Sequence, residues 1–379
     1  MEKVRFGVIG TGGMGSGHCR TMAEIEEAQL TAVCDVVEDV ARSVGEKYGV
    51  PWYTNPQDLL DSGLVDAVII ATPHYFHPPI AIEAFKRSIH VLSEKPIAVT
   101  VSAADAMIQA AEASGCRFGV MYQMRSSGRI QTARRIVEEG RLGEIYRTLM
   151  VMGWYRSQAY YDSGGWRATW TGEGGGVLIN QAPHSLDLFT WLGGLPSRLT
   201  GATRTRRHQI EVEDEAFALL EYPNGAHGYL YASTIEAPGD DRLELCGDCG
   251  KLVLSGSNLE FYELKTPISR HVREATEMWS SPEAERVPLE VPEGGGGHAD
   301  ITRNFARAIL YGESLIAPGK EGINAVEMIN ALILSGHTNK PVDLPVDRSA
   351  YDALLEQLKA HSRGKQVVRE QRVTDPKFA

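Results

Sequence analysis

The glycine-rich turn near the start of the chain is the feature that most limits its fold. Gly10, Gly12 and Gly15 form the pattern G-x-G-x-x-G between a strand-like run, Val4–Ile9, and a helical pattern that begins at Met14. Gly10 permits a tight turn, Gly12 leaves room beside the backbone for a pyrophosphate, and Gly15 lets the helix pack closely on the strand. The first N–H groups of such a helix are free to bind phosphates. The motif in this context predicts a dinucleotide-binding Rossmann domain.

An acidic residue closes the second predicted strand, Leu30–Cys34. Asp35 stands 20 residues after Gly15, where a carboxylate can accept hydrogen bonds from the diol of an adenosine ribose. The same carboxylate would repel a 2′-phosphate, and the residues that follow it bring no cation. We therefore expect NAD rather than NADP as the cofactor. The expected contacts in the turn are Gly10, Gly12, Gly13, Met14 and Gly15.

Two patterns of secondary structure divide the chain. Up to about residue 124, continuous apolar runs such as Ala67–Ile70 alternate with amphipathic helices, which is typical of a parallel sheet covered on both faces. Later strands are separated by turns, and Pro223-Asn224-Gly225 between Phe217–Tyr222 and Ala226–Tyr231 is a strong hairpin signal. We expect an α/β domain with a doubly wound parallel sheet at 1–124 and an α+β domain at 125–379, whose C-terminal tail packs back.

Composition and charge argue against several classes of protein. Lys and Arg total 38 and Asp and Glu 49, a net charge of −11, whereas nucleic-acid binding by phosphate neutralisation needs an excess of cations. The sequence has no apolar run of about 18 residues and no signal-peptide pattern at its start. Its five cysteines are scattered and do not form a disulfide framework. We expect a cytoplasmic protein that binds neither nucleic acid nor a membrane, and no metal is implied.

A lysine follows the short strand Ile89–Leu92 in the segment Glu94-Lys95-Pro96. Ligands of open α/β sheets bind outside the carboxyl ends of the strands, so Lys95 can orient a substrate hydroxyl there. Pro96 favours an extended backbone at Lys95. The alternative interpretation is a solvated lysine in a loop.

A polar face is predicted on a helix over about 180–192. Its residues are spaced at 0, 4, 7 and 11 and are Asn180, His184, Asp187 and Trp191. A histidine among polar groups can act as a general base near neutral pH. The alternative is a helix-surface or capping histidine.

Together these motifs resemble the Gfo/Idh/MocA family, the glucose–fructose oxidoreductase and inositol dehydrogenase family of nicotinamide-dependent enzymes. The resemblance extends to at least Pro345 and rests on Gly10–Gly15, Ala71-Thr72-Pro73 with His77, Glu94-Lys95-Pro96, and Gly174-Gly175-Gly176 followed by His184 and Asp187. It implies a Rossmann domain followed by a substrate-binding and oligomerisation domain on an open, mostly antiparallel sheet. It also implies an NAD(P)-dependent oxidoreductase that acts on a CH–OH group of a sugar or polyol.

The same resemblance gives two residues catalytic positions. Lys95 matches the catalytic-site lysine and His184 the catalytic histidine, so we expect oxidation of a secondary hydroxyl of a sugar, glycoside or inositol-like cyclitol, with the hydride passing to nicotinamide C4. Many members have Asp four residues before that histidine, where this chain has Asn180. An amide cannot take up a proton near neutral pH, so Asn180 is interpreted as a substrate-orienting residue and His184 with Lys95 as the reacting pair.

Further site residues are expected from position and chemistry. The expected cofactor contacts outside the turn are Asp35, Thr72, Pro73, His77, Glu94, Lys95 and Gln123. The expected substrate contacts are Asn180, Asp187, Arg125, Trp166, Arg167, Tyr155 and His74. Alternatives of equal weight are an interdomain salt bridge for Arg125 and an ordinary interface for the aromatic residues, and His77 is interpreted as structural or adjacent to the cofactor.

Two other functions are left open by the residues. One is a redox-neutral sugar-modifying enzyme, a glycosidase, eliminase or epimerase that keeps NAD bound and oxidises its substrate only transiently. The other is a non-enzymatic NAD(H)-responsive binding protein. The family also implies a homodimer or homotetramer formed through the open sheet face, to which the strands over 217–231 belong.

Overall fold

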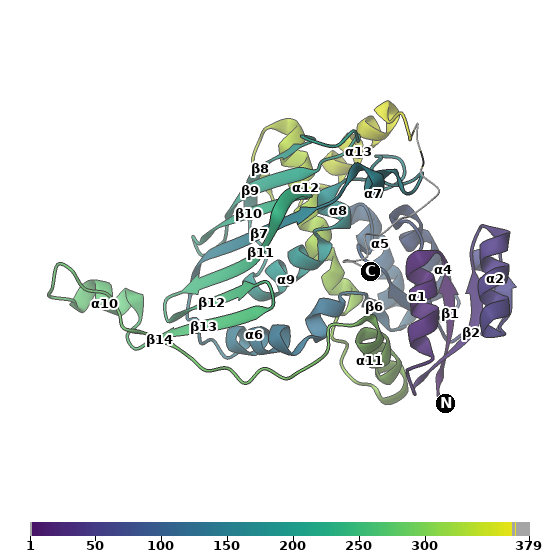
Figure 1. Ribbon diagram of the computed structural model, residues 1–379, viewed down its shortest axis with the longest axis horizontal. Helices are drawn as coiled ribbons and strands as arrows, with labels where there is room; N and C mark the ends of the chain where they lie inside the picture. Colours follow the sequence, from purple (N-terminus) through teal and green to yellow (C-terminus); the bar gives the residue numbers. More distant parts are fainter. Residues whose placement is uncertain (1, 366–367, 369–379) are drawn as a thin grey trace. The chain divides into compact units, whose positions relative to one another are not determined.

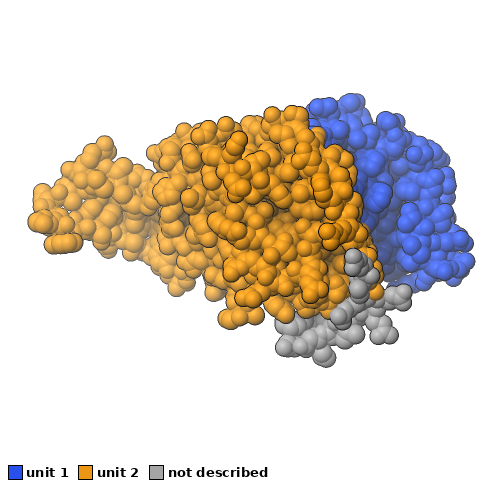
Figure 2. Space-filling model, turned by 90° about the horizontal axis from the view of Figure 1, so that it is seen from above, with its two compact units in different colours: residues 1–128, 293–326 blue, residues 129–292, 327–379 orange. Residues whose placement is uncertain are grey.

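A computed structural model describes residues 2–365 and 368. The chain divides into two compact units: unit 1 contains residues 1–128 and 293–326, and unit 2 contains residues 129–292 and 327–379 (Figure 2). The first change of unit lies four residues from the expected boundary at 124. The expected second domain is not continuous, because the segment 293–326 belongs to unit 1.

Unit 1 is built on a parallel six-stranded sheet in the order β3-β2-β1-β4-β5-β6, which is the order of a Rossmann fold (Figure 1). Its strands are β1 (Val4–Ile9), β2 (Ala28–Cys34), β3 (Trp52–Tyr53), β4 (Ala67–Ile70), β5 (His90–Ser93) and β6 (Phe118–Val120). Its helices are α1 (Gly13–Met22), α2 (Glu38–Tyr48), α3 (Pro56–Asp61), α4 (His77–Lys86), α5 (Val101–Ser114) and α11 (His298–Tyr311), with 3-10 turns η1 (His74–Phe76), η2 (Gln123–Ser126) and η3 (Gly319–Gly322). The expected doubly wound α/β class is confirmed.

Helix α11 explains why a late segment joins the first unit. Its apolar face includes Phe305, which is buried and lies with its ring centroid 6.3 Å from that of Phe6 in β1. A Cβ on Gly119 in β6 would meet the same ring at 2.9 Å. The helix therefore completes the apolar cover of the parallel sheet, which needs helices on both faces.

Unit 2 is built on a nine-stranded sheet in the order β14-β13-β12-β11-β7-β10-β9-β8-β15. Its strands are β7 (Ile145–Tyr155), β8 (Arg198–Arg204), β9 (Glu215–Glu221), β10 (His227–Ser233), β11 (Ile235–Gly247), β12 (Gly250–Ser255), β13 (Asn258–Leu264), β14 (Ala284–Arg286) and β15 (Val342–Asp343). Among the ladders of this sheet within the described residues, only the β7–β10 pair is parallel, so the sheet is mostly antiparallel as expected. The expected hairpin joins β9 to β10.

Helices cover one face of this sheet and leave the other face open (Figure 1). The helices of the unit are α6 (Gly128–Glu138), α7 (Gln158–Asp162), α8 (Val177–Asn180), α9 (Pro183–Gly193), α10 (Ile268–Glu274), α12 (Ile323–Thr338), which begins in unit 1, and α13 (Arg348–His361). Leu245 and Leu252 on the covered face are fully buried, whereas Leu219 on the open face is 65% exposed. Within the described ranges, no helix combines the length and hydropathy that a membrane span requires.

Candidate functional site

The glycine turn has the geometry that a dinucleotide needs. Gly10 has φ +88°, and a Cβ there would lie 2.8 Å from the backbone of Ala71 and Thr72; a Cβ on Gly15 would lie 1.8 Å from the carbonyl oxygen of Gly10. At Gly12, the N-cap of α1, a Cβ would meet no atom within 4 Å, and no side chain caps the helix. The start of α1 thus combines open space with unsatisfied N–H groups, which fits a phosphate group.

Asp35 lies beside this turn at the carboxyl end of β2. Its Oδ2 accepts a hydrogen bond from the N–H of Thr11 at 2.8 Å, and its Oδ1 accepts one from the N–H of Val37 at 3.0 Å. These contacts hold the carboxylate next to the first helix turn. There it can accept hydrogen bonds from the ribose hydroxyl groups and would repel a 2′-phosphate.

The backbone around Lys95 is held from both sides. The N–H of Lys95 donates a hydrogen bond to Oε2 of Glu94 at 3.2 Å. Nδ1 of His77 lies 2.9 Å from the carbonyl oxygen of Pro96. Nε2 of His77 lies 2.8 Å from the carbonyl oxygen of Thr72, so the ring joins the loop after β4 to the loop after β5. His77 is fully buried, and burial lowers its pKa.

Glu94 is a buried carboxylate with a histidine on each side. Nε2 of His18, on α1, lies 2.8 Å from its Oε1, and Nε2 of His298, the first residue of α11, lies 3.9 Å from the same oxygen. Burial by itself raises the pKa of Glu94, but the hydrogen bond from His18 and the charges of His18, Lys95 and His298 lower it to about 2. Glu94 is therefore ionised at neutral pH and acts on Lys95 from inside the protein.

The other predicted residues of unit 1 differ in accessibility. Arg125 is 1% exposed and pairs with Glu321, and both residues belong to unit 1. His74, in η1, is also buried. Met14 is 48% exposed beside the glycine turn. Thr72 and Pro73 lie between β4 and η1, and Gln123 begins η2.

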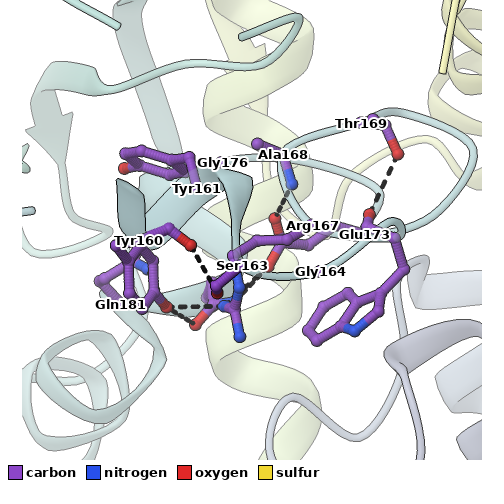
Figure 3. Close-up of polar contacts among 12 residues, drawn as sticks. Tyr160, Tyr161, Ser163, Gly164, Arg167, Ala168, Thr169, Glu173, Gly176 and Gln181 are labelled. Atoms are coloured by element: carbon purple, nitrogen blue, oxygen red, sulfur yellow. Dashed lines mark hydrogen bonds and ion pairs between the residues drawn. The ribbon is translucent and has the colours of Figure 1, made fainter. Parts of the chain in front are cut away.

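Unit 2 contains a ring of polar contacts around Asn180. Figure 3 shows the partners Tyr160, Arg167, Glu173 and Gln181. The amide nitrogen of Asn180 donates to Glu173, and its amide oxygen accepts a hydrogen bond from the hydroxyl of Tyr160 at 3.4 Å. That hydroxyl also accepts hydrogen bonds from Arg167 at 2.6 Å and from Gln181 at 3.0 Å. The ring closes because Arg167 lies 3.7 Å from Oε1 of Glu173.

Glu173 sets the orientation of the Asn180 amide within this ring of contacts. The carboxylate is 1% exposed and also accepts a hydrogen bond from the N–H of Ala168 at 2.5 Å. Burial raises its pKa, against the lowering effect of Arg167 and the hydrogen bonds. Because a carboxylate only accepts hydrogen bonds, it selects the amide nitrogen of Asn180 and leaves the amide oxygen on the side of Tyr160.

A second buried carboxyl group lies beneath the loop of glycines that leads to α8. Oε1 of Glu213 accepts hydrogen bonds from the N–H groups of Gly176 at 2.9 Å and Leu178 at 3.1 Å. Burial, with a contribution from the charge of Glu173, raises the pKa of Glu213 to about 7. Glu213 therefore titrates near neutrality while it supports the helix that ends at Asn180.

The predicted single helix over 180–192 is wrong. Helix α8 ends at Asn180, and α9 begins at Pro183, so Asn180 and His184 lie on different helices. Pro183 is favoured at the first position of a helix and cannot donate a hydrogen bond in a helix interior, which explains the break. His184 and Trp191 are partly exposed on α9, whereas Asp187 is 1% exposed, so these residues do not form one accessible face.

The loop that carries the ring also holds the predicted aromatic contacts. The guanidinium of Arg167 lies 4.7 Å from the ring centroid of Trp166 and 4.4 Å from that of Tyr160. The ammonium of Lys365, after α13, contacts the carbonyl oxygens of Tyr161, Gly164 and Arg167, so the described end of the chain packs back on this loop. Tyr155, at the end of β7, is 58% exposed and lies outside the ring.

Several residues of these clusters have no clear signal in the sequence. His18 lies three residues after Gly15 on the buried side of α1, and Glu173 directly precedes the run Gly174–Gly176. Glu213 and Gln181 carry no spacing that sets them apart. Of these residues, a search for acidic residues next to glycine runs would have found only Glu173, together with Glu293 before Gly294–Gly297.

Comparison with known proteins identifies the fold and the family. Residues 4–122 match the family model described as "Oxidoreductase family, NAD-binding Rossmann fold", and residues 130–253 match "GFO/IDH/MocA C-terminal domain". The chain is 29% identical over 278 residues to the 2,7-anhydro-N-acetylneuraminate hydratase of Escherichia coli, covering 68% of this chain and 72% of the relative. It is 26% identical over 256 residues to the myo-inositol 2-dehydrogenase of Thermotoga maritima, covering 66% and 74%.

A solved structure extends the comparison over most of the chain. The WlbA dehydrogenase from Bordetella pertussis, in complex with NADH and UDP-GlcNAcA, superposes with a TM-score of 0.78 at 26% identity, covering 91% of this chain and all of that one. These matches confirm the expected resemblance, the two-part fold and NAD as the cofactor.

Proposed function

Because the chain belongs to the Gfo/Idh/MocA oxidoreductase family with an NAD-binding Rossmann fold, we propose that it is an NAD-dependent dehydrogenase. Its substrate is a secondary alcohol of a sugar, a glycoside or an inositol-like cyclitol. The relatives and structural neighbours include inositol dehydrogenases and a dehydrogenase solved in complex with NADH and UDP-GlcNAcA, which supports this class of substrate.

The backbone clamp on Lys95 is the observation that carries the proposal. Glu94 accepts a hydrogen bond from the N–H of Lys95, and Nδ1 of His77 contacts the carbonyl oxygen of Pro96. Both side chains are buried, and the segment that they support follows the carboxyl end of β5. A lysine in a solvated loop has no need of such support. A residue that must present an ammonium or amine to a reacting hydroxyl does need it, since small misplacements of a reacting group are costly.

The residues divide the work of the reaction. Bound NAD supplies the hydride acceptor at nicotinamide C4, held by Gly10–Gly15 and Asp35. Lys95 orients the substrate hydroxyl, and His184 accepts the hydroxyl proton as general base. Asn180, with its amide oriented by Glu173, accepts a hydrogen bond from a neighbouring hydroxyl. Trp166 and Arg167 bind the polyol ring through its apolar face and its hydroxyl groups.

A redox-neutral use of NAD is the second candidate. It is supported by the relatives named 2,7-anhydro-N-acetylneuraminate hydratase, because the hydration in their name involves no net oxidation. In that reaction NAD held by Gly10–Gly15 and Asp35 would serve as a transient hydride acceptor, while Lys95 and His184 keep the same roles.

A dehydrogenase screen tests the proposal. The purified chain is supplied with NAD or NADP and a panel of free sugars, glycosides and inositols, and reduced nicotinamide is followed by absorbance. We expect steady NADH formation with a member of the panel. Lys95→Ala and His184→Ala should each lower kcat by about 10²–10⁴-fold, the usual contribution of a positioned acid or base.

Matched variants separate this loss from a general loss of folding. Lys86→Ala and His361→Ala remove an exposed lysine and an exposed histidine, and both should keep full activity. Faster turnover with NADP would overturn the assignment of Asp35. If no substrate yields NADH while the denatured protein releases bound nicotinamide, the redox-neutral reaction replaces the dehydrogenase. Full activity in both Lys95→Ala and His184→Ala would overturn the assigned roles.

A further inference from the structure

A segment that follows α13, residues 362–365, contacts the loop of unit 2 that carries Arg167. The ammonium of Lys365 donates hydrogen bonds to the carbonyl oxygens of Tyr161, of Gly164 at 3.4 Å and of Arg167 at 3.0 Å. An ammonium group has three N–H donors, and these three carbonyl oxygens match that number. Lys365 therefore acts on the backbone of the loop rather than on a ligand.

Glu211 joins the same segment to the loop at a second point. Its Oε2 accepts a hydrogen bond from the hydroxyl of Ser362 at 2.6 Å, and its Oε1 accepts one from the N–H of Arg363 at 2.6 Å. The N–H of Glu211 donates to the carbonyl oxygen of Ala168 at 3.4 Å. The end of α13 is thus connected through one residue to the backbone of the loop.

The backbone between these two contacts is strained. Ala168 has φ +59°, a left-handed conformation that is unfavourable for a residue with a Cβ and persists only where the surroundings fix it. The carbonyl oxygen of Arg167 accepts the hydrogen bond from Lys365, and the N–H of Ala168 donates to Glu173 at 2.5 Å. With the bond from Glu211, three groups hold the two peptide units of Ala168. Figure 3 shows Arg167, Ala168 and Glu173.

Arg167 directly precedes the strained residue and belongs to the ring of contacts around Asn180. Its guanidinium donates to the hydroxyl of Tyr160 at 2.6 Å and lies 3.7 Å from Oε1 of Glu173. If Ala168 relaxed to a negative φ, the peptide group between the two residues would turn, and Arg167 would move with it. Hydrogen bonds weaken steeply outside their preferred distances and angles, so both contacts would be lost. The position of Arg167 thus depends on the groups that keep Ala168 strained.

These contacts make the segment 362–365 part of the substrate loop. We propose that the segment fixes the loop conformation in which Arg167 and Trp166 bind the sugar, with Lys365 as a positioning residue. The proposal rests on the function proposed above, which assigns those two side chains to the substrate. Because Lys365 contacts only the loop and no reacting atom, its loss should weaken substrate binding and leave the chemical step nearly unchanged.

Hydrogen exchange of the full chain, followed by mass spectrometry, tests the contact without any substrate. Lys365→Met keeps an apolar side chain but removes the three donors, so the amides over 162–171 should exchange about tenfold faster than in the wild type. Glu211→Gln, which places an amide N–H against a donor of the segment, should accelerate exchange of the same amides to a smaller extent. Lys340→Met, at an exposed lysine of unit 2, is the control and should leave the loop unchanged. Circular dichroism verifies that each variant is folded. Exchange of the loop at the wild-type rate in Lys365→Met would overturn the proposal.

Steady-state kinetics tests the consequence for the substrate. With the sugar found in the dehydrogenase screen, Lys365→Met should raise KM about tenfold and change kcat less than threefold, whereas Lys340→Met should change neither constant. A loosened loop with an unchanged KM, or an equal fall of kcat and kcat/KM, would show that Lys365 does not position the substrate-binding side chains. If no compound of the panel yields NADH, the proposed function fails, and the exchange rates still decide whether the segment fixes the loop.

Discussion

Two buried glutamates, one in each unit, are ionised at very different pH. Glu94 in unit 1 and Glu213 in unit 2 are both nearly inaccessible to water, and burial raises the pKa of each carboxyl group. The pKa of Glu94 nevertheless falls to about 2, whereas that of Glu213 rises to about 7. Burial alone therefore does not decide the charge of these groups.

Their partners account for the difference. Glu94 receives the His18 hydrogen bond and the Lys95 N–H, and the positive charges near it favour the carboxylate. Glu213 receives two backbone N–H groups at Oε1, but its Oε2 is buried without a hydrogen-bond donor among the described residues, and the nearby charge of Glu173 opposes ionisation. Ionised groups in low dielectric need donors and opposite charges. Unit 1 thus holds a fixed negative charge beneath Lys95, and unit 2 holds a carboxyl group that can change its proton content near pH 7.

Removing the fixed charge should have the largest effect. Glu94→Gln keeps the shape of the side chain but replaces charged hydrogen bonds, worth about 1.5–3 kcal/mol each, by neutral ones. We expect kcat of the proposed reaction to fall about a hundredfold, with NADH affinity, measured by fluorescence titration, nearly unchanged. Glu83→Gln, at a half-buried glutamate of α4 in the same unit that pairs with Lys86 and Arg87, is the control and should retain activity. Activity of Glu94→Gln within twofold of the wild type would show that the negative charge of Glu94 does not contribute to catalysis.

The ring around Asn180 should be less sensitive. Glu173→Gln removes the requirement that the amide nitrogen of Asn180 face residue 173, and it leaves Arg167 without its carboxylate. Because a lost hydrogen bond costs about 1 kcal/mol or slightly more, we expect KM for the sugar to rise about tenfold with kcat changed less than threefold. Steady-state kinetics measures both constants, with Glu221→Gln, an exposed residue of β9, as control. An equal fall of kcat and kcat/KM would instead assign Glu173 a role in the transition state.

Replacing Glu213 should have the smallest effect on catalysis. Its main effect should be on the pH dependence of the free energy of unfolding. Its pKa of about 7 in the folded chain exceeds the ordinary value of 4.5, so the folded state binds more protons between these values. Stability should therefore fall as pH rises from 4.5 through 7, by roughly 1–3 kcal/mol. Glu213→Gln should remove this fall and make the protein more stable than the wild type above pH 7.

Urea unfolding at about pH 5 and about pH 8 measures the difference for both proteins. Glu94 contributes with the opposite sign, because its stabilisation is present above pH 4.5 and is lost only as pH falls toward 2. A Glu213→Gln variant with the pH dependence of the wild type would mean that Glu213 is ionised throughout this range.

Much of the architecture follows from local physical chemistry that is readable in the chain. Gly10 and Gly15 after an apolar strand stand where a Cβ would clash, Gly12 leaves open space at the helix start, and the continuous apolar runs require a buried parallel sheet. Pro223-Asn224-Gly225 specifies its hairpin in the same way. Asp35 lies at the end of β2 as its spacing predicts.

Tertiary contacts decided the remaining features. The segment 293–326 joins unit 1 because Phe305 fills a gap over β1 and β6, and no residue near it in sequence reveals that gap. The break between α8 and α9 separates Asn180 from His184, although their spacing is helical. The opposite pKa shifts of Glu94 and Glu213 arise from groups far away in the sequence, such as His18, 76 residues from Glu94. Spacing along the chain predicts local conformation, but the charge of a buried group depends on donors and dipoles that only folding brings within a few ångströms.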